Sequence, residues 1–127
     1  MTTKTSPCPC GATDYAACCG RYHSGTPAPD AATLMRSRYS AYVLKLEEYL
    51  LATWHPGTRP AALDLAADNA KWLRLEVKKN AQESADHATV EFVARYKVSG
   101  RAYRLHEISR FVREEGRWFY VDGQFPN

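Results

Sequence analysis

The stretch Val90-Glu-Phe-Val-Ala-Arg-Tyr-Lys-Val98, the turn Ser99-Gly100 and the run from Arg101 to Arg113 together decide the fold. Apolar and polar residues alternate along both runs, which is the pattern of a strand with one buried face. A short turn that contains glycine joins neighbouring antiparallel strands. This stretch therefore predicts a β-hairpin.

The same alternation extends the sheet on both sides of this hairpin. Upstream, Leu73, Leu75 and Val77 alternate with charged residues, and downstream Glu114-Glu115-Gly116 turns the chain into the apolar segment 118–121. Short turns give antiparallel neighbours, so the sequence predicts a meander of about four strands.

An apolar stripe with helical spacing precedes the strands. It consists of Met35, Tyr39, Tyr42, Leu46 and Tyr49, widened by Val43, Leu50 and Trp54. Asp30 or Thr33 can cap the start of this pattern, and Pro56-Gly57 ends it. We expect one long helix or two consecutive helices here. A second short helix is expected near residues 60–72, with Leu63, Ala66, Ala67 and Ala70 facing inward. Helices packed on one face of a curved antiparallel sheet make an α+β domain.

All four cysteines lie within twelve residues, as Cys8, Cys10, Cys18 and Cys19. Four thiolates complete the tetrahedral shell of Zn²⁺, and such a closed site is structural rather than catalytic. Disulfides within Cys8–Cys10 or Cys18–Cys19 would form cramped rings. The spacing fits the common zinc-ribbon template poorly. The chemistry of the residues therefore favours one structural zinc ion, and free or redox-active thiols and disulfides stay as alternatives.

The strings Cys8-Pro-Cys10-Gly11 and Cys18-Cys19-Gly20 resemble the SEC-C motif, the zinc-binding element at the C-terminus of the SecA translocation ATPase. The intervening residues are one fewer than in the usual motif and lack its lysines, and Asp14 stands where the family is basic. The resemblance implies that the four cysteines are zinc ligands. It does not extend to the basic face of the motif.

Two polar residues share the apolar face of the strand from Arg101 to Arg113. That face carries Tyr103, Leu105, Glu107, Ser109 and Phe111. A buried carboxylate needs a partner, and Arg36 or Arg38 on the helix is the candidate for Glu107. Two hypotheses stay open. An Arg–Glu pair fixes the helix against the sheet, or Glu107 acts as a base or ligand anchor in a polar pocket.

Three histidines receive ordinary structural roles. His55 ends a helix and is expected to cap carbonyls or to pack on Trp54, with general-base chemistry as the alternative. His23 is expected to be an exposed loop histidine rather than a spare zinc ligand. His106 should be exposed or hydrogen-bonded on the outer face of its strand.

The charge of the chain is modest and interleaved. Seventeen basic and fourteen acidic residues give a net charge of +3, which speaks against nucleic acid as a partner. The densest basic patch is Arg101, Arg104, Arg110, Arg113 and Arg117, diluted by three glutamates. We expect it to be a solvated strand face with cross-strand ion pairs, with phosphate binding as the alternative.

Five longer strings resemble the bacterial YchJ family. They are Leu34–Tyr42, Tyr49–Pro56, Val90–Tyr96, Leu105–Phe111 and Gly116–Gly123. The match covers residues 7–123. It implies an N-terminal SEC-C motif over residues 1–24 and a domain similar to nuclear transport factor 2 (NTF2) over residues 25–127, a cone of curved sheet closed by helices, as in cystatin-like folds. The family carries no established activity.

Two functions are compatible with these features. In the first, the zinc knuckle makes the protein an adaptor that docks another protein, with a homodimer as a further alternative. In the second, an enzyme or small-ligand binder uses the interior of the cone, and Arg36, Arg38, His55, Glu107 and Ser109 are the pocket candidates. The adaptor is favoured. No apolar run spans a bilayer and the start carries no secretory signal, so we expect a cytoplasmic protein.

Overall fold

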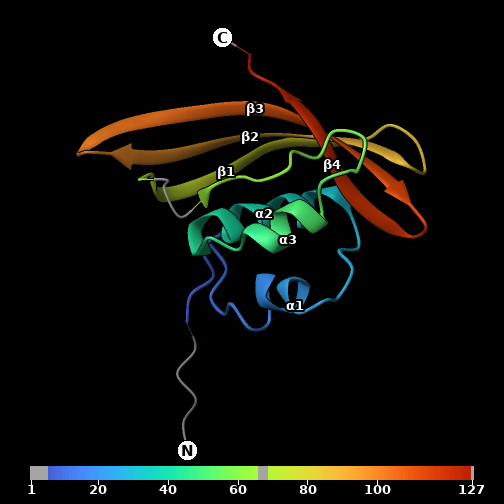
Figure 1. Ribbon diagram of the computed structural model, residues 1–127, viewed down its shortest axis with the longest axis horizontal. Coiled ribbons are helices and arrows are strands. Elements are labelled where there is room, and N and C mark those ends of the chain that lie inside the picture. The colour runs from blue at the N-terminus through green and yellow to red at the C-terminus, as the bar shows by residue number, and fades with distance from the viewer. Residues whose placement is uncertain (1–5, 66–68, 127) are drawn as a thin grey trace, which may run out of the picture.

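The computed structural model describes residues 6–65 and 69–126, and a four-stranded antiparallel sheet dominates it (Figure 1). The strands are β1 (Lys71–Gln82), β2 (His87–Val98), β3 (Arg101–Glu114) and β4 (Arg117–Gln124), and they lie side by side in chain order. All three pairings are antiparallel. The predicted meander is confirmed, and its strands are longer than the sequence pattern indicated.

Two-residue turns connect the last three strands. Ser99 and Gly100 have φ angles of 52° and 81°, and Glu115 and Gly116 have φ angles of 51° and 78°. Positive φ at both central residues is the type I′ geometry, whose twist matches that of the flanking strands. Glycine adopts this conformation without a steric penalty, which explains why both turns are visible in the sequence.

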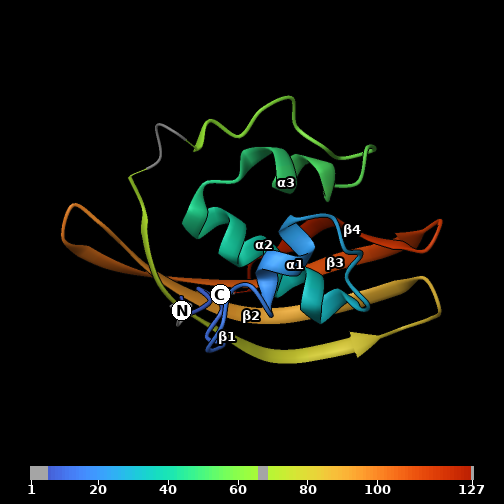
Figure 2. The same ribbon diagram turned by 90° about the horizontal axis from the view of Figure 1, so that it is seen from below.

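Three helices lie on one side of the sheet (Figures 1 and 2). They are α1 (Cys19–His23), α2 (Ala31–Leu44) and α3 (Glu47–Ala52). Helix α2 lies against the strands, and α1 lies on the far side of α2. The side chain of Asp30 accepts a hydrogen bond of 2.7 Å from the backbone of Thr33, so the predicted cap of α2 is confirmed. Lys45 then takes a left-handed conformation, with φ 59°, and separates α2 from α3. The alternative of two consecutive helices is therefore the correct one.

The short helix expected near residues 60–72 is not formed at residues 60–64 or 69–72, although Leu65 is in a 3-10 conformation next to residues outside the described part of the chain. Residues 59–64 form no helical turn, Asp64 has φ 56°, and β1 already begins at Lys71. Leu65 is nevertheless buried in a small cluster with Ala41 and Leu50. A segment without regular secondary structure can bury a single apolar side chain, so burial there does not require apolar residues at helical spacing. Ala66 and Ala67 lie outside the described residues.

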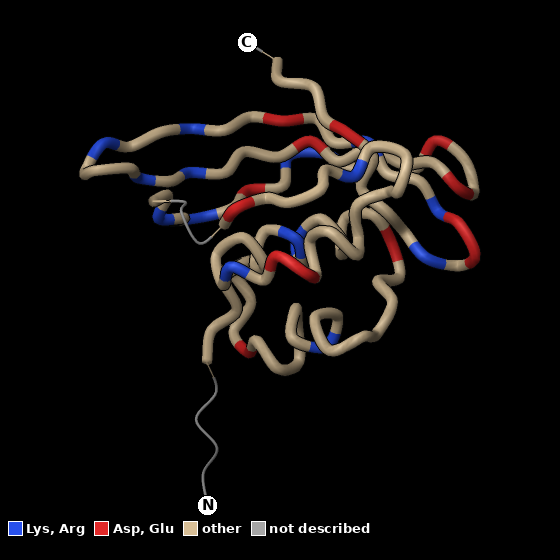
Figure 3. The backbone as a smooth tube through the Cα atoms, in the orientation of Figure 1, with Lys and Arg blue, Asp and Glu red and all other residues tan. Residues whose placement is uncertain are grey.

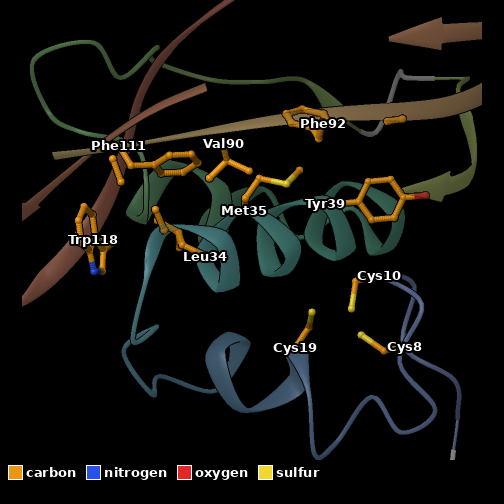
Figure 4. Packing of buried hydrophobic residues seen from close by; sticks show 13 residues of the cluster. Cys8, Cys10, Cys19, Leu34, Met35, Tyr39, Val90, Phe92, Phe111 and Trp118 are labelled. Carbon is orange, nitrogen blue, oxygen red and sulfur yellow. The ribbon is translucent and has the colours of Figure 1, made fainter. Parts of the chain in front are cut away.

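The main core lies between α2 and the concave face of the sheet. Leu34, Met35, Tyr39, Val90, Phe92, Phe111 and Trp118 pack there (Figure 4). Cys8, Cys10 and Cys19 belong to the same buried cluster and lie on the side of α2 that faces away from the sheet. Helix α2 is thus packed on both sides. None of the helices within residues 6–65 and 69–126 is long and apolar enough to cross a membrane.

Candidate metal centre and interior cavity

The four cysteine sulfurs converge on one point below α2. All of them lie within 4.8 Å of one another, with 3.6 Å between the sulfurs of Cys10 and Cys18 and 3.9 Å between those of Cys18 and Cys19. Tetrahedral Zn–S bonds of about 2.3 Å place sulfurs about 3.8 Å apart. The cysteines are free thiols, so the disulfide alternative is excluded. Their spacing fits a tetrahedral thiophilic ion.

Glycines allow the two cysteine pairs to approach each other. Gly11, with φ 112°, closes a tight turn in which its N–H donates to the carbonyl of Cys8 over 3.0 Å. At Gly20, a Cβ atom would lie 2.8 Å from the carbonyl oxygen of Tyr15, which accepts the N–H groups of Cys18 and Gly20. A larger residue would be strained at Gly11 because of its positive φ, and at Gly20 it would clash with the backbone of Tyr15.

The four thiols cannot all ionise at this spacing without a cation. A hydrogen bond from Cys19 lowers the pKa of Cys10 to about 4. Burial raises the pKa of Cys18 to about 11, and the hydrogen bond with Cys10, together with burial, raises that of Cys19. The Cys10 thiolate therefore disfavours ionisation of Cys18 and Cys19. A divalent cation would balance four thiolates, and so the residues fit the zinc ion that the motif implies.

Ser40 of α2 connects the sulfur cluster to the rest of the domain. Its hydroxyl donates to the sulfur of Cys19 over 3.2 Å and lies 3.5 Å from the sulfur of Cys8. Ser40 has no exposed surface. A buried donor of this kind orients sulfur ligands and stabilises their thiolate form. The knuckle is thus bound to α2 through polar as well as apolar contacts.

His23 is half-buried, so the expectation of an exposed loop histidine is wrong. Its Nε2 lies 2.8 Å from the carbonyl oxygen of Ser37, and its Nδ1 lies 2.5 Å from the hydroxyl of Tyr15. Because a carbonyl only accepts, Nε2 carries the hydrogen and Nδ1 accepts from Tyr15. Burial lowers the pKa of His23 and keeps the ring neutral. This histidine joins the knuckle to α2.

A cavity of about 300 Å³ lies between α2 and the concave face of the sheet. Aromatic rings form most of its walls, namely those of Tyr39, Tyr42, Trp72, Phe92, Phe111, Tyr120 and Phe125. Arg38, Glu107 and Ser109 add polar groups to the lining. The cavity therefore combines apolar walls with one polar region, as small-molecule sites do.

Glu107 is buried in this polar region. Its side chain is 8% exposed, and Oε2 accepts hydrogen bonds from Ser109 Oγ at 2.5 Å and from the hydroxyl of Tyr120 at 3.1 Å. Burial raises the pKa of Tyr120, so this hydroxyl keeps its proton and donates. No donor among the described residues reaches Oε1. The prediction that Glu107 and Ser109 face the helices is confirmed.

Gly123 makes room for the Glu107 side chain. It pairs with Ser109 across the β3–β4 ladder, and a Cβ atom there would overlap Oε2 of Glu107 and lie 2.8 Å from its Cγ. The φ angle of Gly123 is outside the left-handed region, so space, and not backbone conformation, requires the glycine. Neither Gly123 nor Tyr120 was identified from the sequence, although Tyr120 lies two residues after Trp118 and so shares its buried face.

Arg38 is buried beside Glu107 but does not pair with it. Its Nη1 donates to the carbonyl of Leu50 over 2.8 Å and to Thr53 Oγ1 over 2.6 Å. Its guanidinium carbon lies 4.6 Å from the centre of the Tyr120 ring. Among the described side chains, no Arg–Glu pair falls within 4.0 Å at this position, so the expected ion pair is wrong. The guanidinium binds the end of α3 instead, because the last carbonyls of a helix have no donors within the helix.

The five pocket candidates divide into two groups. Arg38, Glu107 and Ser109 come together at the cavity, whereas Arg36 is exposed on α2. His55 lies at the surface, where Nε2 is 2.8 Å from Glu114 and Nδ1 accepts from the N–H of Gly57, so neither predicted role of His55 is observed. On the outer face, His106 is hydrogen-bonded to Glu91 at 2.7 Å, as expected.

Comparison with known sequences gives consistent matches over nearly the whole chain. Residues 30–123 match the family model described as YchJ, middle NTF2-like domain. A UPF0225 protein of Methylibium petroleiphilum is 62% identical over 120 residues, which cover 93% of this chain and 88% of that relative. A UPF0225 protein of Xanthomonas campestris is 55% identical over 126 residues, which cover 97% of this chain and 98% of that protein.

Two solved structures share the fold. The solution structure of a SEC-C motif containing protein from Rhodopseudomonas palustris is 32% identical, with a TM-score of 0.84 over 96% of this chain and 100% of that one. The crystal structure of a SEC-C motif containing protein from Psychrobacter arcticus is 31% identical, with a TM-score of 0.80 over 96% of this chain and 84% of that one. Both likenesses include the cysteine-bearing N-terminal segment within their coverage.

Proposed function

The chain belongs to the UPF0225 family, with a YchJ-type NTF2-like domain, and from that premise we propose that it binds a small aromatic molecule in its cavity while its four cysteines hold one structural zinc ion. One observation carries the proposal of ligand binding. The buried carboxylate of Glu107 lines a cavity of about 300 Å³ and has one oxygen that no described residue hydrogen-bonds. Among the described residues, Trp54 Nε1 is the one fully buried side-chain polar atom without a partner, so this oxygen of Glu107 keeps accessible surface and is free to accept from a ligand donor.

The chemistry of the lining supports a neutral ligand that carries one hydrogen-bond donor. Arg38 and Glu107 contribute opposite charges to the same region, so the cavity offers no net charge to attract an ion. The Ser109 and Tyr120 hydroxyls already donate to Glu107, which leaves its second oxygen to accept from a ligand. The aromatic walls favour a flat ring stacked or edge-on against them.

Indole and 1-methylindole test this proposal because the second has a methyl group in place of the N–H donor. Titrating each into the zinc-loaded protein and following backbone amide signals by NMR gives the site and the affinity. We expect indole to shift signals of cavity-lining residues with a Kd in the millimolar range or tighter, which corresponds to about 4 kcal/mol for nine non-hydrogen atoms. 1-Methylindole should bind at least threefold more weakly.

Two leucines on strands provide a matched pair of variants. Leu105 lines the cavity, whereas Leu73 is 46% exposed and does not. Leu105→Trp should fill the cavity and abolish indole binding, and Leu73→Trp should leave it unchanged. Glu107→Leu should remove the preference for indole over its methylated analogue. Equal binding of indole to both tryptophan variants would contradict the proposal.

Docking of a protein partner by the zinc knuckle is the second candidate function. Four thiolates would complete the shell of the ion and leave no position for a substrate, which supports a structural role for the metal. Residues 11, 13, 16 and 17 of the knuckle are exposed, so this turn is available for contact. Both similar structures are of SEC-C motif containing proteins, which is compatible with such a role and assigns no partner.

A capture experiment with two forms of the chain tests the docking function. Immobilised zinc-loaded protein and the Cys18→Ser variant are exposed to the same lysate, and a captured protein is then titrated against the labelled chain by NMR. A true partner should bind only the zinc-loaded form and should shift the signals of residues 11–17. Capture by both forms alike would contradict docking through the knuckle.

A further inference from the structure

Two rows of basic side chains cross three strands on the outer face of the sheet. In the first row Lys71 of β1 lies opposite Lys97 of β2, and in the second row Arg74, Arg95 and Arg104 lie opposite one another on β1, β2 and β3. All five side chains are exposed. We call these five residues the basic rows.

The basic rows lie on the face that the helices leave open. Their strand neighbours Trp72, Ala94 and Leu105 line the cavity on the concave side, and side chains alternate between the two faces of a strand. Figure 3 shows Lys and Arg positions of three strands gathered toward the end of the sheet that extends beyond the helices, while acidic positions are mixed in at the opposite end.

Direct opposition of like charges is unfavourable in a sheet. Cross-strand neighbours are only about 5 Å apart, so like charges there destabilise the pairing. Within the described residues, no carboxylate lies within 4.0 Å of Arg95, Arg104 or Lys97. Glu76 is an acidic neighbour of the rows, and it pairs with Arg74 at 3.1 Å and with Lys78.

At the other end of β3, the arginines are paired with carboxylates. Arg110 forms a two-bond pair with Asp122, with both distances at 2.6 Å, and Arg113 lies 3.3 Å from Asp86. The expected cross-strand ion pairs are therefore confirmed at this end, and the arginine-rich strand divides into a paired half and an unpaired half. The interleaved charges of the sequence conceal this division because it depends on strand register.

We propose that the basic rows bind the phosphate backbone of single-stranded RNA. The forked guanidinium pairs with two oxygens of one phosphate. Each phosphate of a nucleic-acid backbone carries two non-bridging oxygens and one negative charge, so it offers one guanidinium a pair of acceptors. Successive phosphates of a linear chain can then follow the arginine row across the strands, and Lys71 and Lys97 add charge alongside. This site is independent of the cavity and of the zinc knuckle.

Binding is measured by fluorescence anisotropy with a fluorescein-labelled 20-nucleotide oligouridylate at about 50 mM salt, using the zinc-loaded full chain. The test variant is Arg95→Glu/Arg104→Glu. The control is Arg36→Glu/Arg117→Glu, which changes the net charge equally at two exposed positions away from the basic rows. Unlabelled polyphosphate and poly-glutamate serve as competitors. Circular dichroism checks that each variant is folded, and Arg104→Gln alone replaces the double variant if that one does not fold.

We expect the test variant to lose at least tenfold in affinity and the control less than twofold. Each lost phosphate contact should reduce the slope of log K against log salt by about 0.7, so the double variant should lose about 1.4. Displacement of RNA by polyphosphate supports recognition of the phosphate chain. Three results would overturn the proposal: no binding of RNA, whether or not polyphosphate binds, equal losses in test and control variants, or competition by poly-glutamate as effective as that by polyphosphate.

Discussion

Gly123→Ala should destabilise the protein, although alanine suits a strand better than glycine does. In a strand without positive φ, a change from glycine to alanine normally adds about 0.5–1 kcal/mol of stability. At position 123 the new Cβ would overlap the carboxylate of Glu107. The side chain would have to move, and the hydrogen bonds from Ser109 and Tyr120 would be lost.

The size of the effect follows from these two contacts. A hydrogen bond to a charged group contributes about 1.5–3 kcal/mol, and inserting a methyl group into a packed site costs about 1–3 kcal/mol. The displaced carboxylate can turn toward the cavity and regain water there, which offsets part of the loss. We therefore expect the free energy of unfolding to fall by about 3 kcal/mol. For a domain of this size, that lowers the Tm by about 10 °C.

The assay is urea unfolding followed by circular dichroism, with Glu107→Ala as the second arm of a double-mutant cycle. Removing the carboxylate removes the atoms that the new methyl group would meet. Gly123→Ala should therefore be neutral or slightly stabilising in the Glu107→Ala background, and the cycle should give a coupling energy of about 3 kcal/mol. A Gly123→Ala protein as stable as the wild type, or the same loss in both backgrounds, would refute the packing argument.

Further predictions concern the knuckle. Purified reduced protein should contain about one zinc ion per chain by mass spectrometry, and a metal-free preparation from fresh material would contradict the site. Cys18→Ser should lower the Tm of a single unfolding transition, because the knuckle shares its core with α2, and a separate early transition would show independent unfolding. The lowered pKa of His23 means that the unfolded chain binds more protons as the pH falls below about 6.5, so stability should decrease there. The free energy of unfolding is measured by urea at pH 8 and pH 5.5, with the zinc concentration held constant. It should fall less between these pH values in His23→Gln than in the wild type. An equal fall in both proteins would exclude His23 as its cause.

Sequence patterns predicted those features that depend on local periodicity. The alternation around Glu107 placed it and Ser109 on the buried face of β3, and the glycine-containing turns placed the strand ends correctly. The cap at Asp30 was visible because capping needs only residues within one helical turn. Each of these features is decided by neighbours in the chain, so a single sequence contains enough information to identify it.

Features that depend on contacts between distant segments were not predictable in this way. The partner of Arg38 is set by the end of α3, which lies closer to its guanidinium than Glu107 does. His23 is buried because the carbonyl of Ser37 and the hydroxyl of Tyr15 meet it from two other segments. Arg74, Arg95 and Arg104 lie opposite one another on β1, β2 and β3, and this can be recognised only when the strand register is known. In each case the missing information is a tertiary distance.

Helix α2 is the element that the metal centre and the cavity share. Ser40 contacts two sulfurs on one side of the helix, whereas Met35, Arg38 and Tyr39 line the cavity. Only one residue separates Arg38 from Ser40, so the two sites cannot move independently. Zinc binding would fix the knuckle, and the knuckle would hold α2 at the distance from the sheet that leaves the cavity open. If both proposed sites are occupied as described above, removal of the ion should therefore weaken ligand binding in the cavity as well as lower stability.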